Sequence, residues 1–68
     1  MTLAEAKTRL EEVEQVMKAG DYEMAHGKED LLLRDILRAI AYGGAPDAYL
    51  LAGVGVNCTR LQYPRRCA

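Results

Sequence analysis

The chain of 68 residues is long enough for one small domain and too short for two. Half of its residues are apolar and 28% are charged, which is typical of a globular protein and argues against disorder. The formal net charge of −1 argues against direct nucleic-acid binding, because free-standing nucleic-acid-binding proteins usually carry a basic surface. We therefore expect a helical hairpin, a small bundle or an oligomer, and we exclude large enzyme folds.

The first helix is predicted over residues 2–19. Thr2 and Glu5 have the spacing of a capping box, which favours a helix start at this point. Gly20 is suited to end the helix, because glycine readily takes the left-handed backbone conformation. Spacings of three and four residues place one apolar stripe on this helix, formed by Leu3, Ala6, Leu10, Val13 and Met17.

The second helix is predicted over residues 22–42, with Asp21 as its N-cap and two glycines, Gly43 and Gly44, after its end. The connection between the two helices is only about three residues long, which favours antiparallel packing. The seam of this helix is predicted from Leu33, Leu37 and Ile40, and it is widened by Leu32 and Ile36.

The remaining chain predicts a short third helix over residues 46–54, because Pro46 suits a first helical turn, and an irregular tail over residues 57–68. The expected fold is thus all-α, with an antiparallel helical hairpin, a short third helix and an irregular C-terminal tail in one domain, 1–68. No apolar run reaches the length that spans a membrane and no secretory signal is recognisable, so we expect a cytoplasmic protein. In that setting Cys58 and Cys67 are expected to be packed thiols.

A polar column interrupts the second helix. His26, Asp30 and Arg34 follow one another at intervals of four residues, and Glu29 lies beside them. One interpretation makes His26 and an adjacent carboxylate a metal site or an acid–base pair. The other makes the column a polar network that fixes the register of the hairpin. A single histidine supplies too few metal ligands within one chain, so we favour the second interpretation.

From this interpretation we expect no catalytic residue, no metal site, no cofactor and no enzyme activity. We expect His26 to form hydrogen bonds with Asp30 or with the first helix. Replacing His26 by Ala should then lower the melting temperature, whereas zinc or a chelator should leave it unchanged.

The segment Ala25-His26-Gly27-Lys28-Glu29-Asp30 and the helix pattern after it resemble a pattern in small phage and prophage proteins. Those proteins similarly end in an aromatic-rich segment that closes with Cys-Ala, as Cys67-Ala68 does here. The resemblance covers about half of the chain, and Arg66 stands where it would place a tryptophan. It implies a phage accessory protein, and such proteins are often inhibitors of host defence, for example anti-CRISPR proteins.

Two functions of different classes follow from these observations. The first is inhibition of a host protein or defence complex by protein–protein binding, by a chain that also forms a homodimer through its surplus apolar surface. The candidate interface residues are Val16, Tyr22, Leu31, Tyr42, Tyr49 and Tyr63. The alternative is sequestration of a small ligand such as a nucleotide signal, with anion contacts from Arg60, Arg65 and Arg66.

Overall fold

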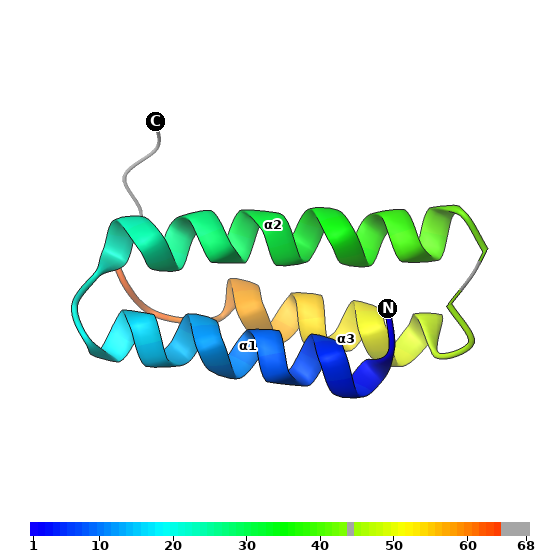
Figure 1. Ribbon diagram of the computed structural model, residues 1–68, viewed down its shortest axis with the longest axis horizontal. Helices are drawn as coiled ribbons and strands as arrows, with labels where there is room; N and C mark the ends of the chain where they lie inside the picture. Colours follow the sequence, from blue (N-terminus) through cyan, green and yellow to red (C-terminus); the bar gives the residue numbers. More distant parts are fainter. Residues whose placement is uncertain (44, 65–68) are drawn as a thin grey trace.

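The computed structural model describes residues 1–43 and 45–64, so that Gly44 and residues 65–68 lie outside the described part of the chain. Three helices follow one another: α1 (Leu3–Lys18), α2 (Tyr22–Ala41) and α3 (Ala48–Thr59). α1 and α2 run antiparallel, and α3 returns along α2 and contacts both of the other helices (Figure 1). The predicted all-α hairpin with a third helix is confirmed.

The ends of the hairpin helices form as their sequences predict. The Thr2 hydroxyl accepts a hydrogen bond from the Glu5 backbone N–H at 3.1 Å, and the Asp21 carboxylate accepts one from the Met24 N–H at 3.1 Å. Gly20 has a φ of 85°, a left-handed conformation that other residues rarely adopt. This turn closes α1 and allows α2 to fold back along it.

All three helices contribute to a single core. On α1, Ala6 and Val13 are buried and the rest of the predicted stripe packs partly buried against them. On α3, the side chains of Leu51 and Cys58 are fully buried. Among the described residues, the buried apolar side chains are those of Ala6, Val13, Ala25, Leu32, Ile36, Leu51, Val54 and Cys58.

The seam predicted for α2 is wrong at its centre. Leu37 is 67% exposed, whereas Leu32 and Ile36, predicted only to widen the seam, are 0% and 2% exposed. Leu33 and Ile40 are partly buried against the core. The reason is that α2 packs against α1 on one flank and α3 on the other, so the stripe between those flanks becomes the most buried.

The predicted bounds of the third helix are also wrong, because α3 begins at Ala48 and continues to Thr59. Gly53 and Gly55 lower the helix propensity of this segment, since glycine disfavours helix by about 1 kcal/mol relative to alanine. However, Gly55 lies buried at the contact with α2, where a Cβ atom would lie 3.4 Å from Leu33 Cδ2. The burial of one face of α3 therefore outweighs its weak helix propensity.

Residues 61–64 after α3 are irregular, as predicted for the tail, but residues 57–59, predicted to belong to that tail, are helical because α3 continues to Thr59. The predictions for Arg65, Arg66 and Cys67 concern positions outside the described residues. Within residues 1–43 and 45–64, none of the helices is both long and apolar enough to cross a membrane.

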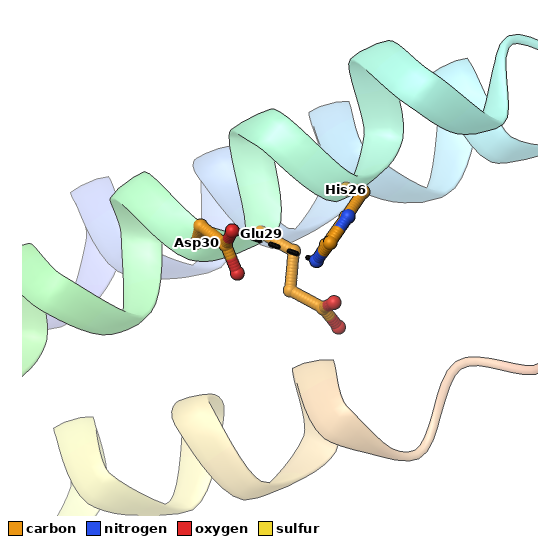
Figure 2. A group of neighbouring side chains, drawn as sticks. All are labelled: His26, Glu29 and Asp30. Carbon is orange, nitrogen blue, oxygen red and sulfur yellow. Dashed lines mark ion pairs between the residues drawn. The ribbon is translucent and has the colours of Figure 1, made fainter. Parts of the chain in front are cut away.

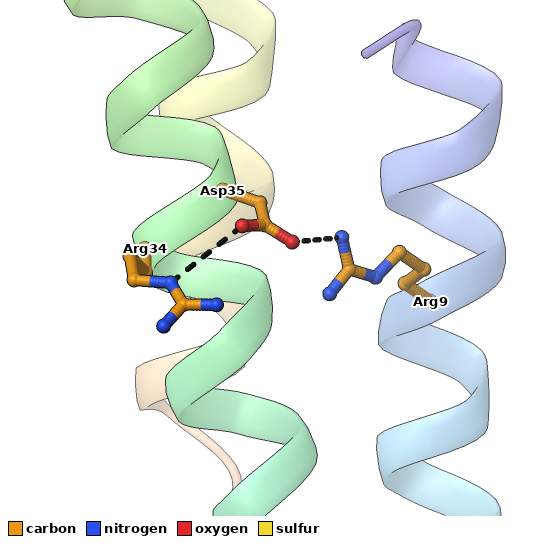
Figure 3. Close-up of polar contacts among 3 residues, drawn as sticks. All are labelled: Arg9, Arg34 and Asp35. Carbon is orange, nitrogen blue, oxygen red and sulfur yellow. Dashed lines mark hydrogen bonds and ion pairs between the residues drawn. The ribbon is translucent and has the colours of Figure 1, made fainter.

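An ion pair links α1 to α2 on the outside of the hairpin (Figure 3). Arg9 Nη1 donates a hydrogen bond to Asp35 Oδ2 at 2.9 Å, and Arg34 Nε lies 3.7 Å from the other oxygen of Asp35. The hydrogen bond from Arg9 holds the pKa of the Asp35 carboxyl below its ordinary value of 3.8, and the nearby arginine charges act in the same direction.

We expect this ion pair to make the stability of the hairpin pH-dependent in acid. Because folding lowers the pKa of Asp35, its contribution is present above the unfolded-state pKa and is lost as the pH falls through the folded-state pKa. Wild type should therefore be more stable than the Asp35→Asn variant at pH 7, and the difference should shrink below pH 3.8. Urea unfolding of both proteins across this range measures the effect, and a difference that grows in acid would contradict it.

Candidate functional site

A buried polar cluster lies where the C-terminal end of α3 meets α2. Glu29 is only 4% exposed. The Tyr63 hydroxyl donates a hydrogen bond to Glu29 Oε1 at 3.0 Å, and the Cys58 thiol lies 3.8 Å from Glu29 Oε2. Glu29 thus ties both α3 and the segment that follows it to the middle of α2.

His26 and Asp30 flank Glu29 on the same helix (Figure 2). One donor atom from each of the three side chains lies within 4.8 Å of the other two. His26 Nε2 is 3.5 Å from Asp30 Oδ2, and the two side chains are 25% and 68% exposed. The Glu29 side chain points from α2 toward α3, whereas Asp30 opens to solvent. The cluster therefore has a buried end and an accessible end.

His26 and Asp30 lie side by side, as their spacing predicts, with Nε2 3.5 Å from Oδ2; the predicted hydrogen bond between them stays a prediction. Arg34 does not share in this contact: its Nε pairs with Asp35. The roles of Cys58 and Tyr63 were missed, because both depend on α3 continuing beyond residue 54 and on the chain turning back to α2. The sequence held one indication that Glu29 is buried. Glu29 precedes Leu32 by three residues, so both lie on the buried stripe of α2.

The candidate interface residues divide into exposed and packed groups. Tyr42 and Tyr49 are 83% and 89% exposed, and they lie on either side of the connection between α2 and α3. Leu31 is 46% exposed, whereas Val16 packs against the core. Tyr63 is partly buried, and its ring stacks on that of Tyr22 with centroids 6.1 Å apart.

The candidate anion contacts are only partly described. Arg60 is exposed and caps the C-terminal end of α3, while Arg65 and Arg66 lie outside the described residues. In the nucleotide-binding alternative, a base would stack on the ring of Tyr63. One face of that ring is already covered, because it stacks on Tyr22.

A shallow depression lies next to Tyr42. It is lined by residues from the first position of the chain and from the second half of α2, namely Met1, Asp35, Arg38, Ala39 and Tyr42. Apolar, acidic and basic groups thus surround one exposed tyrosine. Of these residue types, tyrosine, arginine and methionine are enriched at protein–protein interfaces, whereas aspartate and alanine are depleted there.

Comparison of the chain with protein-family models, with curated proteins and with solved structures finds no match. The functional argument therefore depends on the geometry of this molecule and on the resemblance noted in its sequence.

We expect the hydrogen bond between Tyr63 and Glu29 to stabilise the fold. Replacing Tyr63 by Phe removes the hydroxyl and keeps the ring, so a buried carboxylate oxygen loses a donor. Hydrogen bonds to charged groups contribute about 1.5–3 kcal/mol, and we expect a decrease of this size in the free energy of unfolding. Thermal or urea unfolding measures it. The matched control is Tyr42→Phe, because Tyr42 is largely exposed, and an equal effect in both variants would contradict the prediction.

Proposed function

We propose that the protein is a phage-encoded accessory protein that inhibits a host defence system by binding one of its proteins, as anti-CRISPR proteins do. The observation that carries the binding function is the exposure of two tyrosines, Tyr42 and Tyr49, at one end of the bundle. The assignment to phage and to host defence is supported only by the resemblance around His26-Gly27-Lys28-Glu29-Asp30.

We name Tyr42, Tyr49 and Leu50 the turn-end surface, because they border the connection between α2 and α3. All three are exposed, and Leu50 is 49% exposed. Arg38 lies one helical turn before Tyr42 and lines the adjacent depression. Tyrosine and arginine are among the residue types most enriched at energetically important positions of interfaces. Single exposed apolar residues are ordinary, but aromatic residues gathered at one end of a small domain favour a binding surface.

The biological activity is tested by plating phage on bacteria that produce the protein. We expect a phage targeted by an active defence system to form more plaques on cells with the protein than on cells without it. An untargeted phage is the control, and its plating should not change. Equal plating of the targeted phage with and without the protein, across hosts with different CRISPR systems, would contradict the proposal.

We also propose that two copies of the chain associate through a second surface on α2. Met24 and Leu31 are separated by seven residues, so they lie on the same side of the helix, and they are 52% and 46% exposed. Pairing of two such stripes would bury them between the α2 helices of the two chains.

Light scattering at micromolar concentration tests this association. We expect the mass of two chains for wild type and of one chain for Leu31→Asp, because a charge within the stripe opposes its burial. A wild-type mass of one chain would contradict the dimer.

A further inference from the structure

We propose that His26, Glu29 and Asp30 form a binding site for a divalent transition metal, with zinc as the best-suited ion. Zinc is bound in proteins by imidazole nitrogen and carboxylate oxygen, and three protein ligands with one open position are a common arrangement. The three side chains supply one nitrogen donor and two oxygen donors from consecutive turns of α2. This donor set favours zinc over calcium or magnesium, which take oxygen ligands.

The distances fit such a site. In a tetrahedral zinc site with bonds of about 2.0–2.1 Å, neighbouring ligand atoms lie about 3.3 Å apart. His26 Nε2 and Asp30 Oδ2 are 3.5 Å apart, and the three donor atoms lie within 4.8 Å of one another. Asp30 is 68% exposed, so its carboxylate can rotate to close the remaining distance without disturbing the core. The same exposure gives the ion a path from solvent and leaves a position for water.

A contact from a different part of the chain supports this role for Glu29. The Tyr63 hydroxyl donates to Glu29 Oε1, and it reaches α2 from the segment that follows α3. Carboxylates that bind metals are commonly held by an outer hydrogen bond of this kind, which fixes the orientation of the carboxylate. Glu29 is also the buried member of the group, so it provides a fixed ligand at the base of the site.

The sequence offered two interpretations of the polar column, a metal site or a network that fixes the register of the hairpin, and the position of Glu29 now favours the metal site. A single histidine with exposed carboxylates would be a weak site, but here a buried and oriented carboxylate lies between His26 and α3. Because Glu29 and Asp30 follow His26 by three and four residues, both come near its imidazole only when α2 is helical. Metal binding should therefore stabilise the folded protein.

The experiment titrates zinc chloride into chelator-treated wild-type protein and follows heat of binding, melting temperature and the imidazole signals of His26 by NMR. His26 is the one histidine of the chain, so its signals report on this site alone. We expect saturation at one zinc ion per chain, a melting temperature that rises with zinc concentration, and a shift of the His26 signals.

Two variants and a control complete the test. His26→Ala and Asp30→Asn should each weaken zinc affinity by at least about tenfold, since even outer-shell substitutions have effects of this size. Asp47→Asn removes an exposed carboxylate at the start of α3 and should bind zinc as wild type does. Asp30→Asn keeps the shape of the side chain, so the test remains valid if His26→Ala fails to fold. Unshifted His26 signals, or equal affinity in wild type and Asp30→Asn, would overturn the proposal.

Discussion

Replacing Leu32 by Ala is expected to lower the free energy of unfolding by about 2–5 kcal/mol, the usual effect of truncating a fully buried leucine. Leu32 is 0% exposed and belongs to the core that all three helices share. Domains of this size have only about 3–5 kcal/mol of stability from their core. A large fraction of the variant should therefore be unfolded at room temperature, as measured by circular dichroism and urea titration.

Leu37→Ala is the matched control, because it removes the same atoms from the same helix at a position that is 67% exposed. Substitutions at exposed positions usually change stability by no more than about 0.5 kcal/mol. The sequence pattern alone predicts the opposite, since it places Leu37 in the seam. Greater destabilisation by Leu37→Ala than by Leu32→Ala would show that the packing of α2 described here is wrong.

Replacing Gly55 by Leu is expected to destabilise the protein by about 1–3 kcal/mol, because it forces additional atoms into a packed contact. A Cβ atom at Gly55 would lie 3.4 Å from Leu33 Cδ2 and 3.8 Å from Ile36 Cδ1. A single methyl group fits at these distances, but the rest of a leucine side chain would push α3 away from α2. Thermal unfolding of the variant measures the loss.

Gly53→Leu separates this packing effect from helix propensity. Gly53 lies in the same helix, and a Cβ atom there meets nothing within 4 Å. Both substitutions improve helix propensity by a similar amount, so the difference between the variants reports the contact of α3 with α2. If the two variants have equal melting temperatures, α3 does not pack against α2 through Gly55.

The sequence predicted the hairpin well because its signals are local. Thr2, Gly20 and Asp21 act through hydrogen bonds and backbone conformations within a few residues, and the structure confirms each of them. The apolar stripe of α1 was also predicted correctly, since apolar residues follow only one face of that helix. On α2 apolar residues cover more than one face, so periodicity alone could not identify the buried one.

The polar cluster could be predicted only in part. The spacing of His26 and Asp30 indicates their pairing, because a helix brings residues four apart together. Cys58 and Tyr63 contact Glu29 although they follow it in the sequence by 29 and 34 residues, respectively. These contacts depend on the length of α3, which local helix propensity underestimates because the favourable term is burial against α2.

The exposure of Tyr42 and Tyr49 could not be inferred from residue type, because tyrosines are found both in cores and on surfaces. Tyr63 illustrates this, since it is partly buried and its hydroxyl is bound to Glu29. Only the arrangement of the helices separates the tyrosines available to a partner from the one that holds the fold together.

The most direct test of the proposed function is the affinity of the purified protein for the defence complex that we propose it inhibits, as identified by the plating experiment. We predict that Tyr42→Ser with Tyr49→Ser weakens binding at least about tenfold, which corresponds to about 1.4 kcal/mol, because exposed aromatic residues often dominate binding energy. Val56→Ser, which changes an apolar residue 53% exposed and about two turns further along α3, should bind as wild type does. Unchanged affinity of the folded double variant would contradict the assignment of the turn-end surface as the binding site.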